Sequence, residues 1–343
     1  MPAHARRRRA WAWSLAGLLV VAIVISVAAF GRSSSAPLAA ANDEQTVFRI
    51  CPVGDCSNYP DPSAVRGITI SALQGWLIDQ HMIYKQISAM RRWHANTIRL
   101  QVLQDKLVGE RGQRYAPVYM ALVDKFVRYS LRKHLTVVIA AQTELSLGWV
   151  KNESLPTAAT DAFWDRMTAK YGHDPRIVFD LFNEPRKCSW EQWQAAMQPL
   201  VDHVRAAGSV NQIWVEGRWW ASTLEGVPLL HGQGLVYSFH HPGSPWPWQA
   251  PVGVDTWQRS FGYLADRHVP VIDGEFTNYV GGYYWPRATR TVTAYFHYLR
   301  AHRIGLVAWS LAAGVMSSID YTHALREPHA DGRLVQRYFW GRL

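Results

Sequence analysis

The sequence predicts an α/β protein in which eight parallel strands close into a single (β/α)8 barrel, known as a TIM barrel, surrounded by helices. From residue 67 onward, short apolar runs alternate with longer segments of helical periodicity, which is typical of parallel strands joined by crossover helices. Eight such runs fit into about 280 residues, the usual size of this barrel. Of the 343 residues, 48% are hydrophobic and 18% are charged, the balance of an ordinary globular protein.

The eight predicted strands are short and largely apolar, and most are followed by polar residues. They are Gly67–Ser71, Thr97–Gln101, Leu135–Ala140, Ile177–Phe182, Gln212–Glu216, Leu235–His240, Val269–Gly274 and Gly305–Leu311.

Two helices between these strands are well marked. Ala116–Lys133 places apolar residues on one arc, and Ser189–Ala207 opens with a serine cap and Glu191 in its first turn. Only a weak helix around Ser222–Leu229 is predicted between the fifth and sixth strands. A doubly wound open sheet is the alternative architecture, but no Gly-rich phosphate loop follows any strand. No second folded domain is evident.

The N-terminus reads as a targeting or anchoring segment and not as part of the fold. Arg6–Arg9 precede Ala10–Phe30, which has 21 residues and no charge. This length matches the ~20 residues of a membrane-spanning helix and exceeds the ~7–15 residues of a signal-peptide core. We therefore divide the chain into residues 1–31, a basic end with a transmembrane or signal-anchor segment; 32–46, a flexible tether; and 47–343, the barrel domain.

Positive charge before an apolar segment keeps that end in the cytoplasm, so the barrel is predicted to be extracytoplasmic and membrane-anchored. Secretion is the alternative, since the small residues at 26–28 and 39–41 each offer a cleavage site.

The net charge of +10 is unevenly distributed. Arg6–Arg9 and Arg32 supply five positive charges, and residues 1–41 contain no Asp or Glu. The remaining surplus is ordinary for a domain of this size. No basic run, zinc-ligand spacing or RNA-binding aromatic motif follows residue 41, so nucleic-acid binding is not expected.

The three cysteines suit an extracytoplasmic compartment. Cys51 and Cys56 bracket four residues and could form a local disulfide there. Zinc would need further ligands near this pair, and the sequence offers none. Cys188 is expected to be a buried free thiol. No metal and no organic cofactor is expected.

Two glutamates stand where buried strands run out. VFDLFNEP places Asn183 and Glu184 at the end of the fourth strand, and VPVIDGEF places Glu275 after the seventh. In a barrel, the carboxyl ends of all strands face one bowl that holds the active site, so these glutamates are predicted to share it. Two carboxyl groups that flank a glycosidic bond can divide the work of cleaving it.

Other polar and aromatic residues end neighbouring strands. Three of them also have a purely structural interpretation. Arg99 could form an ion pair inside the barrel, His240 could be a core histidine with its hydrogen bonds satisfied, and Trp309 could pack in the core. Indole rings stack on the apolar faces of sugar rings, which makes Trp219 and Trp246 candidate platforms. The strand-end set is Arg99, Gln101, Gln142, Thr143, Glu144, Asn183, Glu184, Glu216, Arg218, Trp219, Trp220, His240, His241, Glu275 and Trp309.

Five motifs occur in order along the chain: HANTIRL, DLFNEP, YSFHHP, DGEF and AWS. Over residues 64–315 the chain resembles glycoside hydrolase family five, the cellulase-like family in the clan of retaining (β/α)8 glycosidases. The resemblance implies cleavage of a β-linked polysaccharide, as by an endo-β-1,4-glucanase or a mannanase. It also implies these roles: Glu184 as acid/base, Glu275 as nucleophile, Asn183 on the sugar 2-hydroxyl, Arg99 supporting the nucleophile, His240 lining the reactive subsite and Trp309 forming its floor.

The protonation states follow from the spacing that a retaining pair requires. Its carboxyl groups lie only ~5–5.5 Å apart, so the two charges repel and one group should hold a proton near neutral pH. Arg99, if it lies beside Glu275, favours ionisation there and leaves the proton on Glu184.

Two positions depart from the family pattern. After the third strand the family usually has a histidine, whereas Gln142 or Thr143 takes that place here. In the sixth strand it usually has His, any residue, then Tyr, whereas this chain ends the motif with Pro242; Tyr283 or Tyr284 is a candidate substitute. These departures keep two alternatives open, a barrel that binds polysaccharide without cleaving it and an enzyme that transfers glycosyl groups. A monomer is expected.

Overall fold

The computed structural model describes residues 59–70, 73, 80–143, 154–240, 253–276, 279–280, 283–284, 288–310 and 330–343. All of them belong to a compact unit, Val47–Leu343. The predicted membrane segment, the Cys51–Cys56 pair and Trp246 lie outside the described residues. Within the described part of the chain, no helix is both long and apolar enough to cross a membrane.

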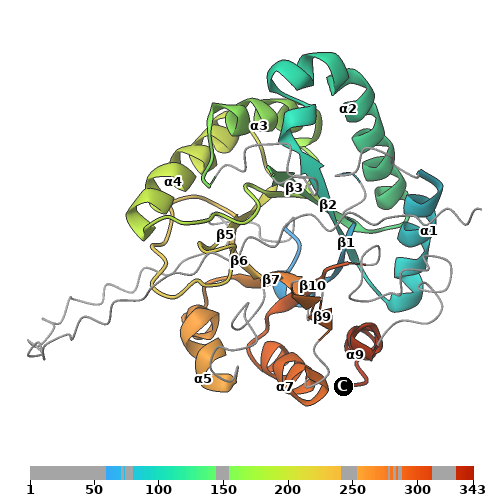
Figure 1. Ribbon diagram of the computed structural model, residues 1–343, viewed down its shortest axis with the longest axis vertical. Helices are drawn as coiled ribbons and strands as arrows, with labels where there is room; N and C mark the ends of the chain where they lie inside the picture. The colour runs from blue at the N-terminus through green and yellow to red at the C-terminus, as the bar shows by residue number, and fades with distance from the viewer. Residues whose placement is uncertain are drawn as a thin grey trace, which may run out of the picture. The chain divides into compact units, whose positions relative to one another are not determined.

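Eight parallel strands close into a barrel, which confirms the predicted fold and excludes the open sheet (Figure 1). Each strand pairs with its neighbours in chain order, and the last returns to the first through Gly67 and Val307. Every predicted strand is found, with ends that differ by at most three residues. The strands are β1 (Arg66–Ile70), β2 (Thr97–Leu103), β3 (Thr136–Gln142), β4 (Ile177–Asp180), β5 (Gln212–Glu216), β6 (Leu235–His240), β7 (Val271–Phe276) and β10 (Gly305–Ala308).

Helices surround the strands. Those described are α1 (Gln80–Met90), α2 (Gly109–Arg132), α3 (Ala158–Tyr171), α4 (Trp190–Ala206), α5 (Val254–Trp257), α6 (Tyr263–Asp266), α7 (Ala288–Ala301) and α9 (Ala330–Phe339). Both well-marked helices are confirmed as α2 and α4. Ser189 caps α4 in a capping box with Gln192, so that each side chain accepts the other's backbone N–H.

The prediction of a weak helix around Ser222–Leu229 is wrong. This segment forms turns, with a short bridge between Arg218 and Thr223. Trp219, Trp220 and Ala221 adopt left-handed backbone angles, with φ of 58°, 58° and 54°. The Leu224 N–H donates to the Ser260 carbonyl at 2.9 Å and not to a carbonyl one helical turn back, so a contact with a distant residue takes the place of a helical hydrogen bond here.

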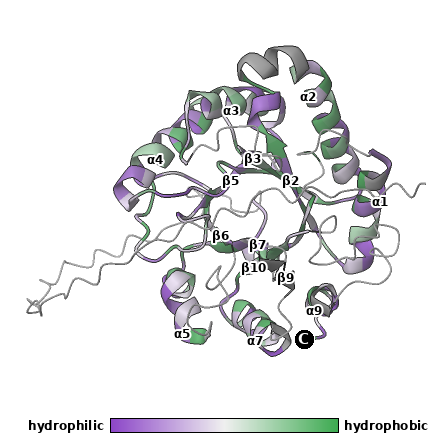
Figure 2. Cartoon of the chain, viewed as in Figure 1, coloured by the Kyte–Doolittle hydropathy of each residue, from purple (hydrophilic) through white to green (hydrophobic). Residues whose placement is uncertain are grey.

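Strand residues alternate between two apolar layers. Val137 and Ile139 pack toward the helices, whereas Val138 between them points into the barrel. The barrel interior is filled by Val65, Val138, Val178, Trp214, Val236, Ile272 and Val307. Figure 2 shows helices that carry both hydrophobic and hydrophilic residues, as expected for elements that cover a barrel on one side and meet water on the other.

A short antiparallel ribbon that the sequence did not predict follows β7. It consists of β8 (Tyr279–Val280) and β9 (Tyr283–Tyr284), with Tyr279 opposite Tyr284. The backbone of both candidate tyrosines therefore lies just beyond the carboxyl end of β7; their side chains are outside the described part.

Candidate active site

The guanidinium of Arg99 in β2 is the centre of the site. Arg99 pairs in register with Val138, so its side chain points into the barrel, where it is fully buried. It donates to Asp180 Oδ2, Glu216 Oε1 and Asn183 Oδ1, each at 2.8 Å, and also to Glu275 Oε1. Because the guanidinium holds its N–H groups in one fixed plane, it sets the positions of side chains from β4, β5 and β7.

Glu275 reaches the bowl because of an irregularity in β7. Ile272 points into the barrel, so strict alternation would turn Glu275 outward. The pairing with β6 shifts by one residue at Gly274, and this shift brings Glu275 opposite His240. Only glycine fits here, because an added Cβ would lie 2.2 Å from the Ser238 hydroxyl.

Glu184 follows β4 with a φ of 54°, a left-handed angle that costs free energy for a residue other than glycine. Its backbone N–H donates to Glu216 Oε2 at 2.6 Å, which holds the turn in place. The Glu184 side chain remains slightly exposed, at 13%. Glu216 thus uses one oxygen to position Glu184 and the other to bind Arg99.

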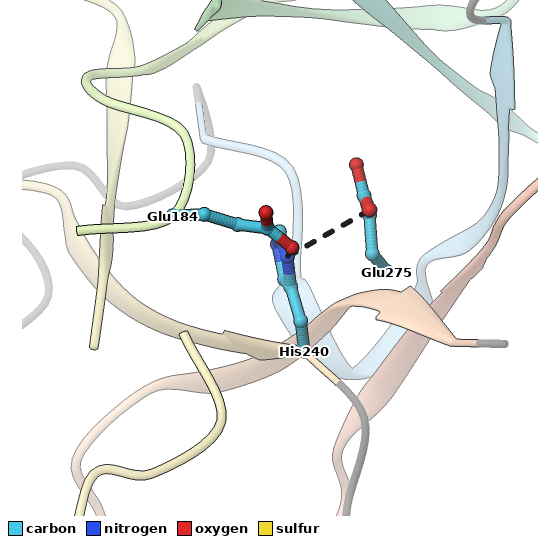
Figure 3. Close-up of side chains that lie close together, drawn as sticks. All are labelled: Glu184, His240 and Glu275. Atoms are coloured by element: carbon cyan, nitrogen blue, oxygen red, sulfur yellow. Dashed lines mark hydrogen bonds and ion pairs between the residues drawn. The ribbon is translucent and has the colours of Figure 1, made fainter. Parts of the chain in front are cut away.

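His240, at the end of β6, lies between the two predicted catalytic glutamates (Figure 3). Its Nδ1 is 3.2 Å from Glu184 Oε1 and 3.8 Å from Glu275 Oε2, and its Nε2 is 3.2 Å from Glu216 Oε1. One side-chain atom from each of Glu184, His240 and Glu275 lies within 4.8 Å of the other two. Two carboxyl groups this close suit a reaction through a covalent glycosyl intermediate.

The charged groups of the site shift one another's pKa values. Burial raises the pKa of Glu275 above its ordinary value, and Arg99 and His240 offset this only in part. Arg99 lowers the pKa of Glu275, as predicted, but burial raises that pKa by more. Burial also acts on Glu216, yet His240 and Arg99 bring its pKa down to about 2.

Burial disfavours charge on His240, but Glu216 and Glu275 raise its pKa well above the usual value and so favour the protonated imidazole. This bears on whether Glu184, His240 and Glu275 could bind a metal ion. A protonated imidazole is not a ligand, and Arg99 is a second fixed positive charge beside Glu275. The three residues as arranged do not suit a cation.

Residues 57–314 match the family model described as Cellulase (glycosyl hydrolase family 5). The chain belongs to this family. The resemblance seen in its five motifs is thereby confirmed.

Two characterised relatives show what this family 5 chain is similar to. It is 24% identical over 283 residues to cellulase CelDZ1 of Thermoanaerobacterium sp, covering 74% of this chain and 67% of the relative. It is 25% identical over 154 residues to the manganese dependent endoglucanase Eg5A of Phanerodontia chrysosporium, covering 42% and 40%. The chain thus spans less than half of the latter protein.

A solved structure shows the same fold. The catalytic domain of the major endoglucanase from Xanthomonas campestris pv. campestris superposes with a TM-score of 0.64 at 19% identity, covering 81% of this chain and 94% of that one.

At the end of β3, where the family usually has a histidine, this family 5 chain has two buried polar side chains. Gln142 Oε1 and Thr143 Oγ1 have no hydrogen-bond partner among the residues that the structure describes. A buried polar atom without a partner is costly unless a ligand, water or nearby chain satisfies it. That Gln142 or Thr143 takes the place of the family's histidine stays a prediction.

The predicted aromatic residues fall into two kinds of environment. Trp219 and Trp220, after β5, are 43% and 39% exposed, with ring centroids 6.3 Å apart. Trp309, after β10, is half-buried and packs partly against the core. The interpretation of Trp309 as a core residue therefore holds in part. His241 and Pro242 lie outside the described part of the chain. Cys188 is buried and unpaired, as predicted.

Three residues matter more than their sequence positions suggested. Glu216 ends β5, and Gln101 lies within β2, where its Nε2 donates to Glu275 Oε1 at 2.6 Å. Asp180 interrupts the apolar run of β4, and a carboxylate inside a buried strand requires a partner. That signal was available, but the identity of the partner, Arg99, was not.

A fourth buried carboxyl, Asp273, points away from the site. It accepts a hydrogen bond from the Tyr295 hydroxyl of α7 at 2.7 Å, and burial raises its pKa to about 8. In the unfolded chain an aspartate ionises near pH 3.9. Between these two values the folded protein holds a proton that the unfolded chain has lost, so this residue's contribution to stability falls as the pH rises from about 4 to about 8.

Asp273→Asn should remove that loss, because asparagine is neutral at every pH and can still accept from Tyr295. We expect a melting temperature equal to that of the parent near pH 4 and higher than the parent near pH 8. Thermal unfolding by circular dichroism across this range measures it. The exposed Asp255→Asn serves as the matched control and should leave the pH dependence unchanged. Parallel curves for Asp273→Asn and the parent would contradict the assignment.

Proposed function

We propose that this chain is a retaining endo-acting glycosidase that cleaves a β-1,4-linked glucan, with Glu275 as nucleophile and Glu184 as acid/base. The observation that carries this proposal is the approach of the two carboxyl groups beside His240, within 4.8 Å at the carboxyl ends of the strands. The names of the similar proteins, a cellulase and an endoglucanase, favour glucan; a β-mannan is the alternative substrate.

In the first step, a carboxylate oxygen of Glu275 attacks the anomeric carbon. The bond to the leaving oxygen breaks, and Glu184 donates its proton to that oxygen. Arg99 and Gln101 both donate to Oε1 of Glu275, which leaves Oε2 as the attacking atom. The His240 imidazole, whose Nδ1 lies 3.2 Å from Glu184 Oε1, stabilises the carboxylate that forms on Glu184.

In the second step, Glu184 as carboxylate takes a proton from water. The water oxygen bonds to the anomeric carbon and the ester to Glu275 breaks, which restores both groups. The configuration of the anomeric carbon is inverted twice and is therefore retained. No metal or organic cofactor takes part in this scheme.

The remaining predicted residues bind and orient the sugar. The Asn183 amide oxygen accepts from Arg99, so its nitrogen is the group left to donate to a 2-hydroxyl. Gln142 Oε1 has no hydrogen-bond partner within the described part of the chain, and we propose that it accepts from a sugar hydroxyl. Trp219 and Trp220 present exposed rings that suit stacking on the sugar rings of the polysaccharide that lie farther from the bond that is cleaved. Trp309 forms part of the floor of the reactive subsite.

A polysaccharide panel with product analysis tests the proposal. We expect reducing ends to be released from β-1,4-glucan, with the β-anomer appearing first by ¹H NMR. An α-anomer as first product would exclude the retaining mechanism. Binding without release from glucan, mannan or xylan would favour a non-catalytic barrel. Longer products in the presence of acceptor sugars would indicate glycosyl transfer.

We also propose that the barrel is extracytoplasmic and anchored by residues 10–30, as the sequence predicts. Retention in the membrane pellet after carbonate extraction tests this, since a secreted form would appear in the supernatant. That the barrel is a monomer stays a prediction.

A further inference from the structure

The end of the barrel opposite the active site carries a concentrated positive charge. Five segments lead into the adjacent strands β3, β2, β1, β10 and β7, which lie side by side in the sheet. Together these segments contain eight Lys or Arg and two Asp. We call this surface the basic arc; its segments are residues 59–66, 91–96, 132–135, 266–270 and 300–304.

The charge is concentrated in this arc. On the other side of the barrel, the corresponding segments before β4, β5 and β6 contain three cations, and each has partners. Arg176 is paired with Asp174 at 2.7 Å, Lys170 lies 3.3 Å from Asp124, and Arg205 donates to three backbone carbonyls. The surplus of six in the arc also exceeds that of all of residues 42–343, where 31 Lys and Arg face 26 Asp and Glu. The rest of the domain is therefore close to neutral, and the arc accounts for its basic character.

The basic arc also contains a cavity. A space of about 330 Å³ lies where the segments before β1 and β10 meet, and Arg66, Arg300 and Arg303 contribute to its lining. Tyr338 and Phe339 of α9 form a more apolar wall. The Arg303 side chain is 81% exposed and lies 4.0 Å from Asp61 Oδ2. Arg66 and Arg300 each use one N–H on a backbone carbonyl, of His94 and Leu343, which leaves their other N–H groups for a ligand. Arginine side chains around an open cavity suit a phosphate group, which accepts several N–H donors at once.

The chain joins the barrel at the middle of this arc. Residues 59–61 lead through a short turn, Pro62–Ala64, into β1, which stands between β2 and β10. The predicted membrane segment ends at Phe30, 28 residues before Tyr59.

We propose that the basic arc docks on the surface of an anionic phospholipid bilayer, with the cavity at Arg66, Arg300 and Arg303 receiving a lipid phosphate. The proposal rests on the proposed membrane anchoring, which keeps the arc near lipid. Attraction to anionic lipid acts within a Debye length, ~8 Å at physiological salt, so it determines orientation only at close range. Docking points the carboxyl ends of the strands, and with them Glu184 and Glu275, away from the bilayer toward a polysaccharide.

Hydrogen exchange of the full chain in lipid nanodiscs tests this. We expect slower amide exchange in residues 91–96, 132–135 and 300–304 when the discs contain phosphatidylglycerol than when they contain phosphatidylcholine alone. Exchange in 218–224, near the active site, should be the same in both. About 1 M NaCl, where the Debye length is ~3 Å, should abolish the difference.

Two charge-matched variants make the test specific. Replacement of Arg91, Arg92, Arg132 and Lys133 with Gln should remove the lipid-dependent protection. Replacement of Lys85, Arg166, Arg259 and Arg290, four exposed cations outside the arc, should preserve it. Equal protection in both kinds of disc, no protection in either, or equal losses in the two variants would each overturn the proposal. Glucan hydrolysis measured on the same preparations separates a failure of docking from a failure of the proposed activity.

Discussion

Glu275→Gln is expected to lower kcat/KM for β-glucan hydrolysis by about 10⁴-fold or more, since no other described group is placed to form the covalent intermediate. Glu184→Gln should cost about 10²- to 10⁴-fold on the same substrate, the usual contribution of an acid/base catalyst. Glutamine preserves side-chain shape, so circular dichroism should show both variants folded. Near-parental activity in either one would show that its assigned role is wrong.

The leaving group distinguishes the two roles. An aryl glycoside with a good leaving group needs no proton, so Glu184→Gln should still form the intermediate and release a burst of phenol. Added azide should then release the sugar as a β-glycosyl azide. Glu275→Gln should give neither the burst nor this product. The reverse pattern would exchange the two assignments.

The raised pKa of Glu275 also determines the acid side of the pH profile. The nucleophile must be ionised, and burial makes it hold its proton to a higher pH than an ordinary glutamate, near 4.3. We therefore expect kcat/KM to fall on acidification at a pH above that value. The pH profile of kcat/KM measures this acidic limb. We assign the limb to Glu275, so only variants that have lost the covalent step should lack it.

Arg99→Met is expected to lower the free energy of unfolding by about 3–5 kcal/mol at pH 7, because it leaves buried carboxylates without their partner. Three carboxyl side chains, those of Asp180, Glu216 and Glu275, bind this one guanidinium. Urea unfolding followed by tryptophan fluorescence measures the loss. Activity should fall as well, because Glu275 and Asn183 lose the same donor.

The pH dependence identifies the cause. Protonation neutralises carboxylates, so the Arg99→Met variant should recover part of its lost stability as the pH falls from 7 toward 5. Arg176→Met is the matched control, since its partner Asp174 lies at the surface and such pairs contribute about 0–1 kcal/mol. A constant deficit for Arg99→Met at all pH values would point to lost packing and not to stranded charge.

Much of the fold could be predicted because its signals are local. A run of four to seven apolar residues between helical segments identifies a buried strand without knowledge of its neighbours. The helix predicted around Ser222–Leu229 was wrong because that prediction, too, rested on local signals alone. Its conformation depends on hydrogen bonds to distant residues, such as that from Leu224 N–H to the Ser260 carbonyl, and no local pattern encodes these.

The site was predictable to the same extent. Glu184 and Glu275 stand at strand ends, and barrel topology brings all strand ends to one place. Arg99 lies inside β2, but its side chain points into the same barrel interior. Glu216 stands at a strand end too, but its use could not be seen. Its two oxygens hold the Glu184 turn and Arg99, at sequence separations of 32 and 117 residues.

The eight strands, their order and the chemical groups at the carboxyl end of the barrel could be inferred from the sequence, because alternation and strand ends are properties of short segments. Which of these groups contact one another depends on the folded barrel. The register shift at Gly274 turns Glu275 inward, closure of the barrel brings Arg99 among three carboxyls, and burial sets their protonation. Each of these depends on pairing and solvent exclusion between distant segments, which exist only once the barrel has closed.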